Sequence, residues 1–164
     1  MQPDYKKAAT IRLLALDVDG VLTDGRLFFD AQGKEQKVFH ARDGYGLRQA
    51  MRNGIEIAII SGRGCKAVTK RMQELGIHHV FLSQDDKIST LKTLMKKLNV
   101  EAHEVAYVGD DLPDIKCMSL AGLAVAVADA HSDVKVMADW TTSLGGGVGA
   151  VREVCDLLIN ARNT

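Results

Sequence analysis

Short apolar runs alternate along most of the chain with segments in which apolar residues recur at helical spacing. The aliphatic and β-branched runs predict buried strands at 11–16, 55–60, 80–82, 105–108 and 123–127. The helical spacing predicts helices at 43–53, 65–75, 88–98, 114–121 and 148–161. Strands that alternate with helices pair in parallel, so we expect a doubly wound α/β sheet with helices on both faces. The ligand site of such a sheet lies beyond the carboxyl ends of its strands.

One segment, from Arg26 to His40, interrupts this alternation. Two β-prone stretches flank a turn that contains Gly33, which predicts a β-hairpin insertion. A two-stranded ribbon is marginally stable by itself. We therefore expect the hairpin to pack against another subunit or over the site, with Phe28, Phe29 and Phe39 supplying its apolar contacts.

Composition narrows the classes of function. The 164 residues have the length of one domain, 1–164, and 21 basic residues balance 21 acidic ones, so we expect no general attraction to nucleic acid or to an anionic membrane. The N-terminus lacks the apolar region of a signal peptide, and no apolar run reaches membrane-spanning length. Cys65, Cys117 and Cys155 lack the spacing of a metal site or a disulfide framework, which is typical of reduced thiols. These features favour a soluble, cytoplasmic protein.

Two carboxylates follow the first predicted strand directly. Asp17 and Asp19 are two residues apart and therefore project to the same side of an extended chain. Burying both beside an apolar strand is costly unless a positive group neutralises them. Mg²⁺ suits this position, because it binds one or two carboxylates together with water and phosphate oxygens. The simpler alternative is a turn or capping pair.

Polar residues also follow the next three strands. They are Ser61, Gly62 and Arg63 after the second, Lys87 after the third, and Asp110, Asp111 and Asp114 after the fourth. Each has a simpler interpretation as a helix cap or a solvated side chain. Together they supply acids for a metal, donors for an anion and two cations, which is the equipment of phosphoryl transfer.

The four segments resemble the motifs of the haloacid dehalogenase superfamily of phosphatases. The matching stretches are Asp17-Val18-Asp19-Gly20-Val21, Ser61-Gly62, Lys87 and Gly109-Asp110-Asp111-Leu112-Pro113-Asp114. The hairpin and the glycine-rich segment from Gly145 to Glu153 resemble a narrower group that lacks a cap domain. That group forms homotetramers and hydrolyses sugar-acid phosphates of lipopolysaccharide synthesis. The resemblance implies a haloacid dehalogenase-type α/β sheet with a hairpin insertion at about 26–40 and no cap domain.

The resemblance also implies roles for the acids and for Lys87. Asp17 would be the nucleophile that forms an aspartyl-phosphate, and Asp19 would protonate the leaving oxygen and then activate water. Mg²⁺ would be held by the side chains of Asp17 and Asp110 and by the main-chain carbonyl of Asp19. Lys87 would offset negative charge, and Asp114 would orient it.

Substrate contacts are implied for a larger set of residues. Ser61 and the Gly62 amide would bind phosphoryl oxygens at a helix N-terminus. Arg63 and Arg71 would present guanidinium groups to the carboxylate of a sugar acid, although Arg71 also fits a solvated helix face. The full set is Asp19, His40, Ala41, Arg42, Asp43, Gly44, Arg48, Ser61, Gly62, Arg63, Arg71, Lys87 and Asp111. Because there is no room for a cap domain, a neighbouring subunit would close the pocket, with the hairpin as the assembly element.

Other functions remain open at this stage. The nearest is a phosphatase of the same group that acts on a nonulosonate 9-phosphate, such as phosphorylated sialic acid. A receiver-like signalling module also has a phosphorylatable aspartate, but Asp19 would shorten the life of a phosphoaspartate. A catalytically inactive scaffold is the third alternative, although every expected catalytic side chain is present. The group often carries a longer C-terminal tail that folds towards an adjacent site, whereas this chain stops at Asn163-Thr164.

Overall fold

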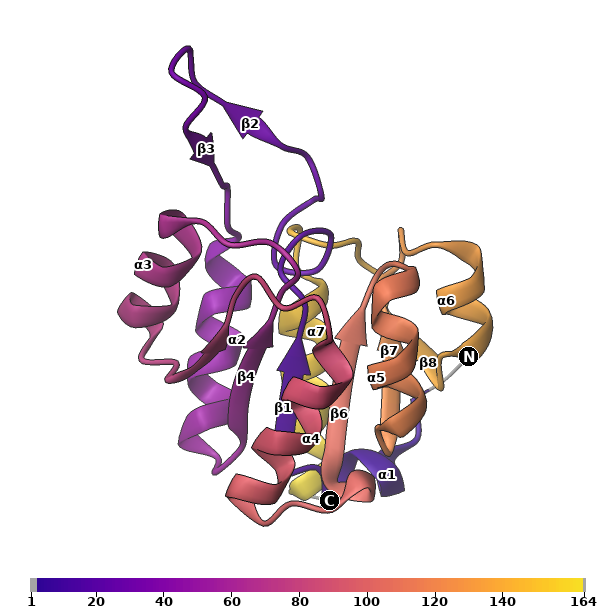
Figure 1. Ribbon diagram of the computed structural model, residues 1–164. Helices are drawn as coiled ribbons and strands as arrows, with labels where there is room; N and C mark the ends of the chain where they lie inside the picture. Colours follow the sequence, from indigo (N-terminus) through magenta and orange to yellow (C-terminus); the bar gives the residue numbers. More distant parts are fainter. Residues whose placement is uncertain (1–2, 164) are drawn as a thin grey trace.

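A computed structural model describes residues 3–163, in which six strands form one parallel sheet (Figure 1). Met1, Gln2 and Thr164, which belong to the expected domain range, lie outside the described residues. The strands are β1 (Leu13–Leu16), β4 (Glu56–Ile60), β5 (His79–Phe81), β6 (Val105–Gly109), β7 (Leu123–Ala126) and β8 (Trp140–Thr141). Their order is β5-β4-β1-β6-β7-β8, and every pair is parallel. The expected doubly wound α/β sheet is confirmed.

β1 occupies the centre of the sheet. Ala15 pairs with Ala58 of β4 on one side and with Tyr107 of β6 on the other. All four residues of β1 are buried, as expected for a strand that helices cover on both faces. The chain therefore reaches Asp17 at the middle of the carboxyl edge.

Helices cover both faces of the sheet (Figure 1). They are α1 (Tyr5–Thr10), α2 (Ala41–Arg52), α3 (Lys66–Leu75), α4 (Lys87–Leu98), α5 (Ile115–Leu120), α6 (Ser132–Met137) and α7 (Ala150–Arg162), with short 3₁₀ turns at Ala102–Glu104 and Leu112–Asp114. α7 packs against α1 and α2 on one face, and α4 packs against α5 on the other. Within residues 3–163, no helix combines the length and the apolar character that crossing a membrane requires.

Three short elements differ from the sequence-based expectation. α1, α6 and β8 were not predicted, because two short helices and a two-residue strand leave little periodicity to detect. Side chains cap both helices: Asp4 accepts hydrogen bonds from the main-chain N–H groups of Lys6 and Lys7, and the His131 ring accepts one from that of Asp133. These caps are the local signals that indicate a helix start.

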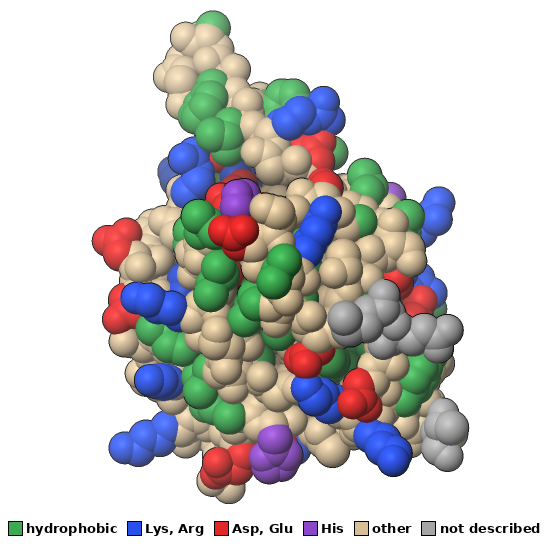
Figure 2. All heavy atoms as spheres, turned by 90° about the vertical axis from the view of Figure 1, so that its right-hand side faces the viewer, with side chains coloured by type: hydrophobic (Ala, Val, Ile, Leu, Met, Phe, Trp, Pro, Cys, Tyr) green, Lys and Arg blue, Asp and Glu red, His purple; other side chains and the backbone are tan. Residues whose placement is uncertain are grey.

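The hairpin rises above the carboxyl ends of the strands (Figure 1). Its strands, β2 (Phe28–Phe29) and β3 (Glu35–Gln36), pair antiparallel. Phe29 is 57% exposed and Val38 is 70% exposed, and Figure 2 shows hydrophobic side chains along the projecting hairpin. Phe39 instead packs against the core of the domain. The hairpin thus carries an apolar surface that no other part of residues 3–163 covers.

Candidate active site

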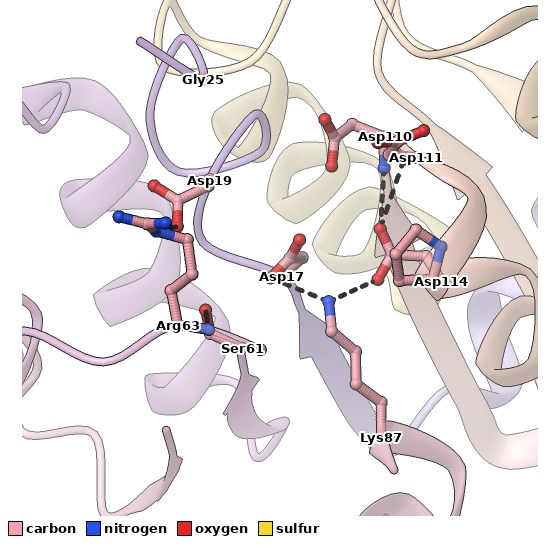
Figure 3. Close-up of a pocket in the computed structure, with 11 residues that line it drawn as sticks. Asp17, Asp19, Gly25, Ser61, Arg63, Lys87, Asp110, Asp111 and Asp114 are labelled. Atoms are coloured by element: carbon pink, nitrogen blue, oxygen red, sulfur yellow. Dashed lines mark hydrogen bonds and ion pairs between the residues drawn. The ribbon is translucent and has the colours of Figure 1, made fainter. Parts of the chain in front are cut away.

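A cavity of about 300 Å³ opens at the carboxyl ends of β1, β4 and β6 (Figure 3). All four polar segments that were expected at strand ends contribute to it. The lining residues are Asp17, Asp19, Gly25, Ser61, Gly62, Arg63, Lys87, Asp110, Asp111, Pro113 and Asp114. Residues far apart in the sequence therefore converge here, as the strand-end rule predicts.

Asp17 lies at the floor of the cavity, directly after β1. Its Oδ1 accepts a hydrogen bond from the Val18 N–H at 2.7 Å and lies 3.0 Å from Nζ of Lys87. Burial, together with repulsion from Asp114, raises the pKa of Asp17 to about 6, although Lys87 works against the rise. A further cation beside this carboxylate would favour its ionised form.

Lys87 is a buried cation between two carboxylates. It begins α4, is 7% exposed, and its Nζ donates to Oδ1 of Asp114 at 2.8 Å. Oδ1 of Asp114 also accepts from the Tyr107 hydroxyl at 2.9 Å, and its Oδ2 accepts from the Asp110 N–H at 3.1 Å. Burial disfavours the ammonium, but the charges of Asp114 and Asp17 outweigh it and raise the pKa of Lys87. Asp114 therefore holds Lys87 in place, as expected.

Replacing Lys87 with methionine should lower the free energy of unfolding by about 3 kcal/mol, because the change leaves buried carboxylates without their cation. Urea unfolding at neutral pH measures the loss. Lys92→Met, on the exposed face of the same helix, should change stability by less than about 0.5 kcal/mol. A loss below about 1 kcal/mol in Lys87→Met would show that the ion pairs do not stabilise the fold.

Asp17, Asp110 and Asp114 form a cluster that fits a divalent cation. Each offers a carboxylate oxygen, and these oxygens lie within 4.8 Å of one another. Burial and the charges of Asp114 and Asp17 raise the pKa of Asp110 to about 8, so ionising this carboxyl is unfavourable unless a further cation joins Lys87. Both oxygens of Asp114 already accept hydrogen bonds, which leaves Asp17 and Asp110 as the better ligands. Oxygen donors of this type suit Mg²⁺.

The loop after β1 needs glycine beside Asp110. Gly20 has a φ of +89°, and a Cβ at this position would lie 2.0 Å from Oδ2 of Asp110. Only glycine adopts this backbone conformation easily and leaves space for the carboxylate. The Asp-x-Asp-Gly pattern thus brings its own acids and Asp110 to one place.

A second charge cluster borders the cavity around Asp19. Its members are Asp19, Glu35, Lys37 and Arg63. Nζ of Lys37 lies 2.5 Å from Oδ1 of Asp19 and 2.7 Å from Oε1 of Glu35. Nη2 of Arg63 lies 3.3 Å from Oε1 of Glu35. The hairpin thus sends two charged side chains to the site, and neither was among the expected site residues. Their i, i+2 spacing, which places both on one side of a strand, is the signal that indicates such a pair.

Residues 79–145 match the family model of haloacid dehalogenase-like hydrolases. The 3-deoxy-D-manno-octulosonate 8-phosphate phosphatase KdsC of Escherichia coli K12 is 51% identical over 156 residues, covering 95% of this chain and 83% of the relative. The chain belongs to the 3-deoxy-D-manno-octulosonate 8-phosphate phosphatase family. The same enzyme of Yersinia pestis is 46% identical over 158 residues, covering 96% of this chain and 84% of the relative.

Solved structures of the phosphatase family share the fold. The 3-deoxy-D-manno-octulosonate (KDO) 8-phosphate phosphatase of Moraxella catarrhalis was solved with a magnesium ion, a phosphate ion and KDO. It matches with a TM-score of 0.95 at 45% identity, covering 97% of this chain and 91% of that chain. The Yersinia pestis phosphatase matches with a TM-score of 0.96 at 46% identity, covering 97% and 86%. The fold is therefore that of these phosphatases over nearly its whole length.

Ser61 differs from the expected helix N-terminus of a phosphate site. α3 begins only at Lys66, and its N-cap is Cys65, because residues 62–64 form a separate turn. Oγ of Ser61 accepts a hydrogen bond from the Arg63 N–H at 3.2 Å. Ser61 and Gly62 line the cavity in this turn, so any donors they offer to an anion come from the turn and not from α3.

Several residues that the resemblance implies as substrate contacts do not line this cavity. They are His40, Ala41, Arg42, Asp43, Gly44, Arg48 and Arg71. Arg71 borders a separate small cavity beside α2 and pairs with Glu74 at 3.0 Å. Arg48 donates to the main-chain carbonyl of Glu74 at 2.7 Å. Within residues 3–163, Arg63 and Arg71 thus line different cavities, and their joint contact with a sugar carboxylate stays a prediction.

Asp43, one of the implied substrate contacts, makes a structural contact within its own chain. It is 2% exposed, and its Oδ1 accepts a hydrogen bond from the Arg152 N–H in the first turn of α7 at 2.8 Å. Burial raises the pKa of Asp43, and the main-chain N–H groups of Arg152 and Gly149 oppose the rise. Asp43 therefore ties α2 to the N-terminus of α7.

The glycine-rich segment, residues 145–149, supports the loop after β1. A Cβ on Gly146 would lie 1.8 Å from the Gly20 carbonyl oxygen, and one on Gly147 would lie 2.5 Å from main-chain atoms of Thr23 and Asp24. The N–H of Gly147 donates to the carbonyl of Val21 at 3.0 Å. Glycine is required here because two backbone segments touch with no space for a side chain between them.

Proposed function

We propose that this protein is a Mg²⁺-dependent phosphatase that removes phosphate from 3-deoxy-D-manno-octulosonate 8-phosphate. The observation that carries the proposal is the convergence of Asp17, Lys87 and Asp110 in one cavity of a chain that belongs to this phosphatase family. The ligands of the Moraxella catarrhalis relative, a magnesium ion, phosphate and KDO, match the two requirements of such a site, a cation and a phosphorylated sugar acid.

In the proposed reaction, an oxygen of Asp17 attacks phosphorus while the bond between phosphorus and the sugar oxygen breaks. Asp19 gives its proton to that leaving oxygen, so the sugar departs as an alcohol. Water then attacks the aspartyl-phosphate and gives a proton to Asp19, which releases phosphate and regenerates the carboxylate of Asp17 and the carboxylic acid of Asp19. Lys87, 3.0 Å from Asp17, offsets the negative charge that nucleophile and phosphate bring together.

The proposed metal ligands are the side chains of Asp17 and Asp110 and the main-chain carbonyl of Asp19. When bound, Mg²⁺ would screen the repulsion between the nucleophilic carboxylate and the phosphate dianion. Asp114 stays with Lys87, because its oxygens accept the bonds that hold that lysine and Tyr107.

For substrate binding, we propose that Ser61 and the Gly62 amide contact phosphoryl oxygens and that Arg63 contacts the sugar carboxylate. Lys87 and Asp111 contact the substrate from the opposite wall of the cavity. The exposed and half-buried residues that do not line the cavity of their own chain act on a neighbouring subunit. They are His40, Ala41, Arg42, Arg48 and Arg71, whereas Asp43 and Gly44 are buried and position these residues through the packing of α2.

We propose a homotetramer as the active assembly. The exposed apolar surface of the hairpin supports this proposal, since such a ribbon needs a covering partner. The three free cysteines are consistent with a reducing, cytoplasmic location, which we also propose.

A phosphate-release screen over sugar-acid phosphates, with and without Mg²⁺, tests the function. We expect Mg²⁺-dependent release, with kcat/KM at least about tenfold higher for the octulosonate 8-phosphate than for a nonulosonate 9-phosphate. The reverse preference would assign the alternative substrate of the same group. No release from any sugar-acid phosphate would overturn the proposal.

A further inference from the structure

Lys37 is a buried cation that the proposed chemistry does not use. Its side chain is 3% exposed, although it lies on the hairpin, whose tip projects from the protein. Its partners are the carboxylates of Asp19 and Glu35. Burying a lysine is costly, and the two short ion pairs offset this cost. The same ion pairs fix where the two carboxylates lie.

The contact leaves the two oxygens of Asp19 in different situations. Oδ1 is bound by Lys37 at 2.5 Å. Oδ2 is buried, and within residues 3–163 no group is close enough to form a hydrogen bond with it. Nε of Arg63 lies 3.9 Å from Oδ2, and Figure 3 shows the arginine side chain beside the carboxylate. A buried carboxylate oxygen without a partner is costly, so Oδ2 is ready to bind an incoming group.

Glu35 extends this arrangement. Its Oε1 contacts Lys37 at 2.7 Å and Arg63 at 3.3 Å, so one carboxylate holds both cations of the cluster. Two carboxylates and two cations therefore balance one another's charge where the hairpin joins the domain. Because Glu35 and Lys37 both belong to the hairpin, the path of this segment determines where Lys37 meets Asp19.

We propose that Lys37 is a positioning residue for the phosphatase reaction. By holding Oδ1, it fixes the rotation of the Asp19 carboxylate and leaves Oδ2 to exchange the proton with the leaving oxygen of the substrate. This inference rests on the proposed function, in which Asp19 is the general acid. It assigns a task to the base of the hairpin that is separate from subunit assembly.

The leaving group distinguishes positioning of the acid from a general electrostatic or structural role. An alkyl phosphate such as a sugar phosphate needs a proton on its departing oxygen. p-Nitrophenyl phosphate does not, because p-nitrophenolate is stable as an anion. A misplaced acid slows the first substrate alone, whereas a disturbed cavity or a lost positive charge slows both.

The test is Lys37→Met, with kcat/KM measured for both substrates at saturating Mg²⁺. This constant covers the steps up to release of the leaving group. We expect a loss of about 10²-fold for the sugar-acid phosphate and of less than about threefold for p-nitrophenyl phosphate. Lys34→Met, an exposed lysine of the same hairpin, should leave both values unchanged. Equal losses on the two substrates, or no loss on the sugar phosphate, would overturn the inference.

Two measurements keep the test decisive. Circular dichroism and sedimentation compare the fold and assembly of each variant with those of the parent protein. If Lys37→Met does not fold, Lys37→Gln is judged by the same ratio of losses. If the parent hydrolyses only a different alkyl phosphate, the proposed substrate fails and the ratio is measured with that compound. If the parent hydrolyses no phosphate ester, the proposed function fails and this inference with it.

Discussion

Asp17→Asn is expected to lower phosphate release by roughly 10⁴-fold or more, as the loss of a covalent nucleophile does in other enzymes. The amide is neutral and a poor nucleophile, so it cannot form the phosphoenzyme. The cavity should survive, because Lys87 keeps its 2.8 Å contact with Asp114. A steady-state assay with the sugar-acid phosphate measures the loss, and a thermal melt verifies that the variant is folded.

Asp24→Asn provides the matched control. Asp24 belongs to the same loop, but its carboxylate pairs with Arg26 at 2.5 Å and does not line the cavity. Its activity should stay within about twofold of the parent protein. An Asp17→Asn variant with a tenth or more of the parent rate would refute the nucleophile assignment.

Removing divalent cations should abolish turnover and change how stability depends on pH. In the metal-free protein the pKa values of Asp17 and Asp110, about 6 and about 8, lie above the ordinary 3.8. The folded state then binds protons more tightly than the unfolded state, so the stability from these groups is complete below the ordinary value. It is lost as the pH rises through the folded values.

Mg²⁺ competes with these protons and should bind more tightly as the pH rises. At about a hundredfold excess over its Kd, the ion adds about 2.7 kcal/mol, or about 5–10 °C in Tm for a domain of this size. We expect most of this gain at about pH 8 and little at about pH 5.5. Differential scanning fluorimetry at both pH values, after dialysis against EDTA, measures it.

Asp110→Asn is the control variant for the metal site. It removes one proposed ligand and one repelling charge, so it should gain stability without metal at about pH 8 and should not respond to Mg²⁺. A gain in Tm that is equal at both pH values, or that persists in this variant, would count against a cation held by Asp17 and Asp110.

Much of the fold follows from local patterns in the sequence. Every residue of Leu13–Leu16 is apolar, so both faces of this strand are apolar, which predicts a central strand. Glycine marks the ends of helices, as Gly76 does for α3. β8 has only two residues, Trp140 and Thr141, and depends on pairing with β7. No local pattern predicts a strand of that length, because its stability comes from tertiary contact.

The site is predictable where it lies at strand ends and not where it depends on longer paths of the chain. Asp17 and Asp110 follow adjacent strands, so parallel pairing alone brings them together. Lys37 reaches Asp19 because the chain returns from the projecting hairpin to the edge of the cavity, and the sequence does not specify that path. Arg71 shows the converse: its spacing from Arg63 fits a common ligand, but α3 turns its side chain towards α2.

The close fit of the glycine-rich segment against the backbone of Gly20 and Thr23 has a consequence for biosynthesis. The ribosome delivers the nucleophile, Asp17, 128 residues before Gly145, the first residue of this supporting segment. A nascent chain therefore carries its reactive carboxylates through the synthesis of that long stretch without the segment that shapes their loop, and hydrolytic competence should arise abruptly once the segment packs.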